Sequence, residues 1–244
     1  MPNPYFQFKQ FVVFHDKCAM KVGTDGVLVG AWAQVDGARR VLDIGTGSGL
    51  IALMLAQRNP DAFVTAVDID AAAVKQAREN VARTSWSDRM EVDRLDMVDR
   101  LDIRKAPEEW NGCFDAIVSN PPYFVESVKC PQAQRNTARH TDELDFDALL
   151  SKVSVLLSEK GSFSVVLPAT ASADFVPLAL GKGLHLLRQT WVHPRQELPA
   201  KRVLMAFVKH PCAQTEITHL PVETERHVYT PEFSKLAKDF YLAL

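Results

Sequence analysis

The residues best suited to chemistry stand in a row, Asn120-Pro121-Pro122-Tyr123. They follow residues 114–119, a short apolar run whose β-branched residues predict a buried parallel strand. Two prolines prevent both further strand pairing and a helix, so the chain must leave the sheet in a stiff turn. The turn would hold an amide, a carbonyl and an aromatic ring at the carboxyl edge of the sheet, where open α/β sheets bind ligands. These groups suit a planar amino group, although a plain strand-exit turn with a surface Tyr would have the same sequence.

A second motif predicts a nucleotide-binding unit. Residues 40–44 form a buried strand, Gly45-Thr46-Gly47-Ser48-Gly49 a turn, and residues 50–58 an apolar helix. The glycines let the backbone approach a ligand, and the helix N-terminus offers free N–H groups. Asp68 ends the next predicted strand, about twenty residues past the glycines, where a ribose-binding acid belongs.

The glycine spacing does not favour a dinucleotide site. That fingerprint has glycines at its first, third and sixth places, whereas here they stand first, third and fifth, and the sixth residue is Leu50. Asp43, before the turn, is unusual for a dinucleotide and suits a ligand with a positive amine. Asp43, Asp68 and Asp96 close three successive predicted strands, so we expect them along one edge, although each could alone be an ordinary strand-end acid.

Strands and helices alternate along the chain, which is typical of a mostly parallel sheet covered on both faces. We predict strands at residues 40–44, 63–67, 91–95, 114–119 and 163–167, and helices at 50–58, 71–83, 145–157 and 171–180. A hairpin of residues 184–192 and 203–208 would place one antiparallel strand in the sheet. Gly161, just past the helix at 145–157, would serve as its stop signal.

We find no linker and predict one domain over residues 1–244. Its parts are an N-terminal extension or lid, a core, and a tail with a possible strand and a short helix, at residues 1–38, 39–210 and 211–244. In the first part, Phe6 to Phe14 predict one or two short strands. A helix follows over Val27 to Trp32, which Thr24 or Asp25 could cap.

Composition limits the possible partners. The chain has 244 residues, 47% of them hydrophobic, and a net charge of −2, so a nucleic-acid surface must be a local patch. Four scattered cysteines without ligand spacing indicate reduced thiols in a cytoplasmic protein. The start has no signal-peptide pattern, and no apolar run approaches the ~20 residues of a membrane span.

A local basic patch is predicted at residues 182–202. This stretch has five cations and only one acid, Glu197; the cations are Lys182, Arg188, Arg195, Lys201 and Arg202. A solvated hairpin is the plain alternative.

Together, the glycine loop, the three acids and Asn120 to Tyr123 resemble the class I S-adenosylmethionine methyltransferases, in their amino-methylating branch. The resemblance implies an α/β, Rossmann-like fold with a seven-stranded, mostly parallel sheet whose last strand is antiparallel. It implies S-adenosylmethionine as cofactor. The methionine part would lie on the glycine loop with its amine near Asp43, the ribose on Asp68, and the adenine amine on Asp96. The implied cofactor residues are Lys21, Thr24, Asp43, Gly45, Thr46, Gly47, Gly49, Asp68, Ile69, Asp96, Met97 and Asn120.

Further segments resemble the bacterial enzymes that methylate the exocyclic amine of the adenosine 3′ to a valine tRNA anticodon. They are residues 21–26, Arg139-His140, 229–232 and 238–241. The resemblance implies a tRNA substrate, and the chemistry needs no metal, because methyl transfer from a sulfonium creates little charge. Catalysis would rest on Asn120, Pro121 and Tyr123: two oxygens accept the amine hydrogens and the ring stacks on the base. The candidate RNA contacts are Arg135, Arg139, His140, Arg188, Arg195, Lys201 and Arg202.

Other functions stay open at this point. A protein glutamine amide poses the same chemical problem, but enzymes acting on it carry a sizeable N-terminal helical domain, and only about 38 residues precede the first core strand here. DNA adenine methylation lacks an inserted stretch for sequence reading. A non-catalytic RNA-binding protein could keep the fold, although the intact Asn120 to Tyr123 motif speaks against it. We expect a cytoplasmic monomer.

Overall fold

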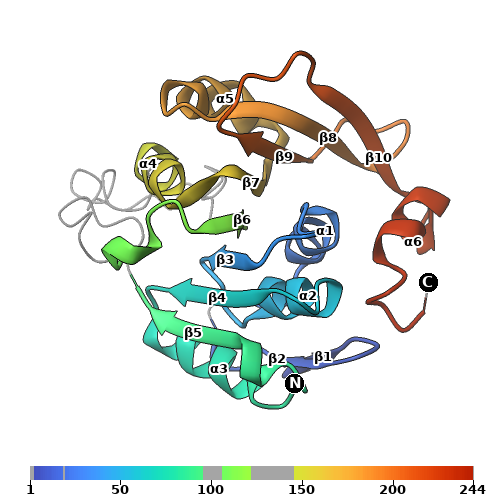
Figure 1. The fold of residues 1–244 in the computed structure, drawn as a ribbon. Helices are drawn as coiled ribbons and strands as arrows, with labels where there is room; N and C mark the ends of the chain where they lie inside the picture. Colours follow the sequence, from blue (N-terminus) through green and yellow to red (C-terminus); the bar gives the residue numbers. More distant parts are fainter. Residues whose placement is uncertain (1–2, 19, 96–105, 122–145, 244) are drawn as a thin grey trace, which may run out of the picture.

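The computed structural model describes residues 3–18, 20–95, 106–121 and 146–243. A nine-stranded sheet runs through the molecule in the order β11-β10-β8-β9-β7-β6-β3-β4-β5 (Figure 1). Its strands are β3 (Arg40–Ile44), β4 (Phe63–Asp68), β5 (Met90–Arg94), β6 (Phe114–Ser119), β7 (Leu157–Pro168), β8 (His185–Arg195), β9 (Arg202–Val208), β10 (Glu216–Glu225) and β11 (Val228–Tyr229). Strands β5, β4, β3, β6 and β7 are parallel, and β9 is antiparallel to both β7 and β8.

Across the sheet, the seven neighbouring strands β5, β4, β3, β6, β7, β9 and β8 are the expected ones, with β9 as the antiparallel strand. The Rossmann-like fold is therefore confirmed. The strand count was two short, because β10 and β11 of the tail extend the sheet beyond β8. Most residues of β10 are exposed or half-buried, and it contains Pro221, as an outer strand can. Such a strand has too little apolar alternation to stand out in the sequence.

Helices cover both faces of the sheet. They are α1 (Thr24–Trp32), α2 (Leu50–Arg58), α3 (Ala71–Val81), α4 (Phe146–Leu156), α5 (Ser172–Gly181) and α6 (Pro231–Ala237). One buried core joins α1, α2, α3 and α6 to one face, and a second joins α4 and α5 to the other (Figure 1). This two-faced burial explains why the central strands read as continuous apolar runs.

Helix α1, within the part expected as an N-terminal extension or lid, belongs to the core. Its residues from Gly26 to Trp32 are buried. A Cβ on Gly30 would stand 2.8 Å from the Met54 sulfur, so the missing side chain lets α1 approach α2 closely. The expected side-chain cap was also wrong: Gly23 caps α1 without a side-chain hydrogen bond, and Asp25 instead pairs with Arg202.

Gly161 was expected to stop the helix before it, and the structure places it inside a strand. Helix α4 ends at Leu156 and β7 begins at the next residue. The register between β6 and β7 shifts between Phe114 and Ala116. At this irregularity a Cβ on Gly161 would stand 2.8 Å from the Phe114 carbonyl oxygen. Glycine is therefore required by close backbone contact in the sheet.

The first residues form a separate hairpin of β1 (Tyr5–Gln7) and β2 (Val12–Phe14), as the aromatic pattern indicated. Phe8 and Phe11 stack with ring centroids 4.7 Å apart. Tyr241, near the end of the chain, stacks on Phe8 at 6.0 Å. The hairpin is thus held against the same core that α6 covers.

Candidate active site

The glycine loop and the Asn120 turn leave the sheet side by side. Ile44 pairs with Ser119 on one side and with Val67 on the other. The Ser119 hydroxyl also donates to the Ile44 carbonyl oxygen at 2.8 Å. Gly45 directly follows Ile44, and Asn120 directly follows Ser119, so the two motifs begin about one strand spacing apart, ~4.8 Å. The two motifs, which are 75 residues apart in the sequence at the Ile44–Ser119 contact, therefore lie side by side at the carboxyl edge of the sheet.

Protein contacts alone shape the glycine loop. The Gly45 and Thr46 N–H groups donate to the Val67 carbonyl oxygen at 2.9 and 3.0 Å. The Gly47 N–H donates to Asp68 Oδ2 at 2.8 Å. Gly45 and Gly47 have φ of 75° and 56°, which other residues rarely adopt, and a Cβ on either would meet nothing within 4 Å. The loop is rigidly held and bordered by open space, as a ligand cradle requires.

Asp43 lies beneath this loop. It was expected to close its strand, but it stands inside β3 and is fully buried. Its Oδ2 accepts from Thr46 Oγ1 at 2.6 Å and from the Ala52 N–H at 3.1 Å. Its Oδ1 is buried without a hydrogen-bond partner in the part of the chain that the structure describes. A positively charged amine would satisfy this oxygen.

The ionisation of Asp43 gives a testable pH dependence. Burial raises its pKa from 3.8 to about 7, Thr46 and Ala52 oppose the shift, and Asp68 adds to it. Because the folded pKa exceeds the unfolded one, the folded protein binds the extra proton between these values. We expect the free energy of unfolding of the ligand-free protein to fall by on the order of 2 kcal/mol between pH 5 and pH 7.5. Urea unfolding of wild type and Asp43→Asn checks this, since the neutral variant should lack that part of the slope. Equal slopes would contradict the raised pKa.

Asp68 stands at the edge as expected, ending β4. Besides Gly47, it accepts from the Asp70 N–H through Oδ1 at 2.9 Å. A carboxylate has about four acceptor positions, so both oxygens can still accept from ribose hydroxyls. Ile69 beside it is 57% exposed, a large apolar side chain left uncovered where a base would pack. Asp70 caps α3 by accepting from the Ala72 N–H.

Asn120 carries the second unsatisfied acceptor of the edge. Its Oδ1 is buried and has no hydrogen-bond partner among the described residues. An unpaired buried oxygen costs free energy that a bound donor would recover. Pro121 is buried next to it. Six other expected site residues lie outside the described residues: Asp96, Met97, Tyr123, Arg135, Arg139 and His140.

Lys21 and Thr24 are exposed, and Thr24 is the first residue of α1. The neighbouring Asp25 accepts from Arg202 Nε at 2.8 Å. Arg202 pairs with Pro168 at the carboxyl end of β7, so the start of α1 lies at the same sheet edge as the glycine loop. The structure therefore brings Thr24 to the expected edge, on the far side of β6 from Asp68.

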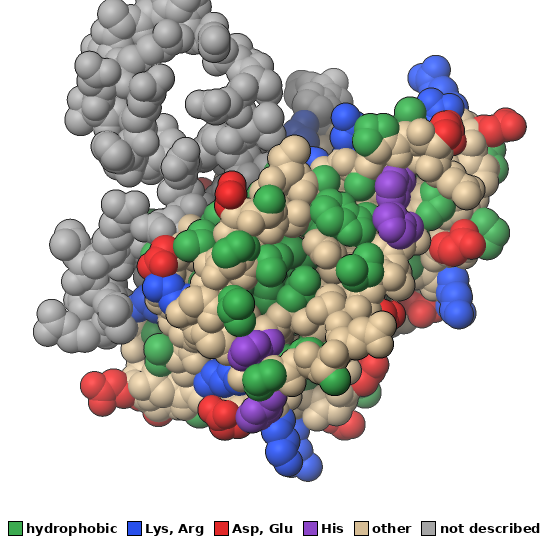
Figure 2. All heavy atoms as spheres, turned by 90° about the horizontal axis from the view of Figure 1, so that it is seen from above, with side chains coloured by type: hydrophobic (Ala, Val, Ile, Leu, Met, Phe, Trp, Pro, Cys, Tyr) green, Lys and Arg blue, Asp and Glu red, His purple; other side chains and the backbone are tan. Residues whose placement is uncertain are grey.

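Three of the five cations expected as one RNA patch are engaged in contacts within the chain. Arg188 lies over the Trp32 ring at 3.8 Å and donates to the Trp32 carbonyl oxygen, which corrects its assignment to an RNA surface. Lys182 pairs with Asp147, and Arg202 with Asp25. On the face shown in Figure 2, hydrophobic side chains gather in the middle, and most of the described Lys and Arg side chains lie toward the edges. Arg195 and Lys201 stay exposed at the β8–β9 turn.

Sequence reasoning missed Asn80 and Gln76 of α3, which are both buried. The available signal was their spacing, because two polar residues four apart lie on one helix face and share it with the buried Ala77. Within the described residues, no group of three or more His, Cys, Asp or Glu side chains could hold a metal ion. No described helix is long and apolar enough to cross a membrane.

Comparisons with known proteins agree with this geometry. Residues 22–169 match the family described as the methyltransferase small domain. A tRNA1(Val) (adenine(37)-N6)-methyltransferase from Phocaeicola vulgatus is 54% identical over 242 residues, covering 99% of each chain. A relative of the same name from Serratia proteamaculans is 44% identical, covering 97% of this chain and 89% of the relative. The crystal structure of a predicted O-methyltransferase from Agrobacterium tumefaciens has the same fold, with a TM-score of 0.70 at 23% identity, covering 88% of this chain and 96% of that one.

Proposed function

The chain belongs to the tRNA1(Val) (adenine(37)-N6)-methyltransferase family, and from this premise we propose that it methylates the exocyclic amine of an adenosine in tRNA. The observation that carries the proposal is the buried, unpartnered Oδ1 of Asn120 beside the glycine loop. We further propose that the whole chain acts as one methyltransferase domain in the cytoplasm. In support, β10 and β11 of the tail pair within the same sheet as the core strands.

The described residues fit S-adenosylmethionine, the cofactor of this family. When bound, it supplies a methyl group carried on a positively charged sulfonium sulfur. After the transfer this sulfur is part of a neutral thioether. Asp43 Oδ1, the unpartnered oxygen beneath the loop, suits its amine. Gly45 and Gly47 border open space for the methionine part, and Asp68 and Ile69 suit the ribose and the base.

Asn120 and Pro121 would prepare the adenine amine for reaction. The lone pair of that nitrogen is delocalised into the ring, so the amine is a poor nucleophile. Asn120 Oδ1 would accept one N–H and the Pro121 carbonyl oxygen the other, which favours a pyramidal nitrogen with a localised lone pair. Asn120 is uncharged, and the surplus proton leaves to water after the N–C bond has formed. Positioning is then the main contribution of the protein.

Labelled cofactor and bulk tRNA that lacks this modification test the proposal. We expect label in tRNA, recovered as N6-methyladenosine after digestion to nucleosides. Label in a glutamine side chain of a protein would favour the amide-methylating alternative. RNA binding without transfer would indicate a non-catalytic RNA-binding protein.

For the tRNA we propose a docking surface at the β8–β9 turn, with Arg195 and Lys201 as phosphate contacts. Strand β8 is the third strand from β6, so this turn lies roughly 14 Å from Asn120 across the sheet. That is a few nucleotides along an RNA strand. Both side chains are exposed, and Arg195 meets Glu197 only at 3.6 Å.

Reversing Arg195 and Lys201 to Glu is expected to weaken tRNA binding and to flatten its salt dependence. Each lost phosphate contact should reduce the slope of log K against log salt by about 0.7. The matched control reverses Arg39 and Lys160 to Glu, so that the net charge changes equally. Both are exposed: Arg39 directly precedes β3, and Lys160 lies in the first part of β7. A salt titration of tRNA binding compares the variants. Identical slopes in the two double variants would remove the β8–β9 turn from the docking surface.

A further inference from the structure

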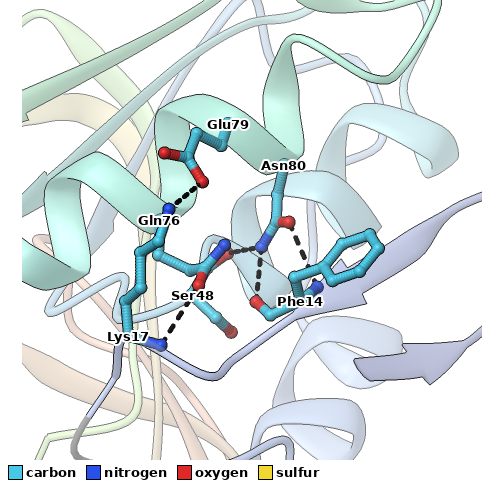
Figure 3. Close-up of polar contacts among 6 residues, drawn as sticks. All are labelled: Phe14, Lys17, Ser48, Gln76, Glu79 and Asn80. Atoms are coloured by element: carbon cyan, nitrogen blue, oxygen red, sulfur yellow. Dashed lines mark hydrogen bonds and ion pairs between the residues drawn. The ribbon is translucent and has the colours of Figure 1, made fainter. Parts of the chain in front are cut away.

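Asn80 ties together three parts of the chain that are distant in sequence. It lies on α3, is 0% exposed, and uses its whole amide (Figure 3). Its Nδ2 donates to the Phe14 carbonyl oxygen and to the Ser48 carbonyl oxygen, both at 2.8 Å. Its Oδ1 accepts from the Phe14 N–H at 3.1 Å. One buried side chain thus links the N-terminal hairpin to the glycine loop.

The contact with Ser48 holds a peptide group of the glycine loop. The Ser48 carbonyl oxygen points to Asn80, and the N–H of the same peptide, on Gly49, donates to the Thr46 carbonyl oxygen at 2.9 Å. This peptide group is therefore fixed from both sides. Gly49 in turn caps α2 and would meet Ala77 of α3 at 3.3 Å if it carried a Cβ. Without Asn80, the Ser48 carbonyl would lose a buried partner and the loop would be free to tilt.

The same face of α3 holds the strap, which we define as residues 14–18. One turn before Asn80, the buried Gln76 accepts from the Lys17 N–H at 3.2 Å. The Lys17 side chain also pairs with Glu79 (Figure 3). That exposed pair contributes little, so the two buried amides carry the attachment.

The strap leads to the cofactor edge. Cys18, its last residue, is half-buried, and burial together with the nearby Asp68 and Asp70 carboxylates raises the pKa of its thiol to about 11. Asp68 is the acid that holds Gly47 and that we propose binds ribose. The geometric link between the strap and this site is α3, which binds residues 14 and 17 of the strap and, through Asn80, the Ser48 carbonyl oxygen of the glycine loop.

We propose that Asn80 is a positioning residue for cofactor binding, which couples the strap to the glycine loop so that both keep the geometry that the cofactor requires. The inference rests on the proposed function. It assigns Asn80 to cofactor affinity and not to methyl transfer, because the hydrogen bonds of its side chain among the described residues go to Phe14 and Ser48 and not to Asn120.

Asn59 offers a matched control at the other end of the sheet. It is 6% exposed, and its Nδ2 donates to the Val35 and Ala38 carbonyl oxygens at 2.7 and 2.8 Å. Its Oδ1 accepts from the Asp61 N–H at 3.1 Å. Asn59→Ala and Asn80→Ala thus delete the same three kinds of hydrogen bond, but only Asn80 touches the glycine loop and the strap.

Calorimetry with S-adenosylmethionine measures the Kd of each variant. We expect Asn80→Ala to raise the Kd about 10-fold and Asn59→Ala less than about twofold, at comparable losses of stability. At saturating cofactor, the transfer rate of Asn80→Ala should stay within about threefold of wild type. Hydrogen exchange at the Phe14 and Lys17 amides should accelerate in Asn80→Ala only.

Equal Kd values for Asn80→Ala and Asn59→Ala would overturn the inference while the proposed function stands. A wild-type protein that fails to bind S-adenosylmethionine would overturn both. If Asn80→Ala does not fold, Gln76→Leu replaces it, since this variant keeps an apolar side chain of similar size and removes the acceptor of the Lys17 N–H. It should raise the Kd about threefold, and an unchanged Kd would then overturn the coupling.

Discussion

Replacing Asn120 with Ala is expected to slow single-turnover methyl transfer by on the order of 10²–10³-fold, the typical effect of deleting one preorganised polar contact in a transition state. The physical reason is the buried Oδ1, which has no partner among the described residues and is placed to accept an amine hydrogen. The Kd for S-adenosylmethionine should change by less than about threefold, because the glycine loop and Asp68 do not depend on Asn120.

Two variants control for local disruption at Asn120. Ser119→Ala removes the neighbouring buried hydrogen bond to Ile44 without touching the proposed acceptor, and its transfer rate should stay close to wild type. Asn120→Asp keeps an acceptor oxygen and should retain more activity than Asn120→Ala. A near-normal single-turnover rate in Asn120→Ala would remove this side chain from the mechanism.

Replacing Asp68 with Ala should weaken S-adenosylmethionine binding by about 1.5–3 kcal/mol, the usual contribution of hydrogen bonds to a charged group, or roughly 10- to 150-fold in Kd. Two contributions are lost together: the proposed bonds to ribose, and the acceptor that holds the Gly47 N–H at 2.8 Å. Isothermal calorimetry at fixed pH measures the change.

Two further variants separate the two roles of Asp68. Asp68→Asn keeps an acceptor for Gly47 and loses the charge, so its Kd should lie between those of wild type and Asp68→Ala. Asp70→Ala removes a carboxylate two residues away that caps α3, and it should lower stability but leave the Kd within a few-fold. Equal Kd values for Asp68→Ala and Asp70→Ala would contradict the assignment of the ribose site.

Local patterns were enough to locate the main parts of the site. The strand that precedes Asn120, the glycine loop and the strand that ends at Asp68 each lie within one short segment, so periodicity and turn residues indicate them directly. The alternation of strands and helices indicated a mostly parallel sheet, in which the carboxyl ends of these strands share one edge. The sequence predicted that Asp43 would suit a positively charged amine. It did not predict that Asp43 lies inside β3 and not at its end, since strand ends cannot be read to one residue.

Contacts between distant segments could not be read in this way. Arg202 meets Asp25 and Arg188 meets Trp32 across more than 150 residues, so their charges appeared available in the sequence. The buried role of Asn80 depends on Phe14 and Ser48, which no local pattern connects to α3. Gly161 looked like a helix stop because its close contact with Phe114 belongs to a neighbouring strand.

The most direct test of the central claim is the position of the transferred methyl group. Unmodified valine tRNA is incubated with the protein and labelled S-adenosylmethionine, beside a matched transcript in which adenosine 37 is replaced by guanosine; this is the position named for the relatives. We predict one methyl group per transcript, found as N6-methyladenosine at position 37, and none in the guanosine transcript. Equal labelling of both transcripts, or label on any other nucleoside, would contradict the proposed function.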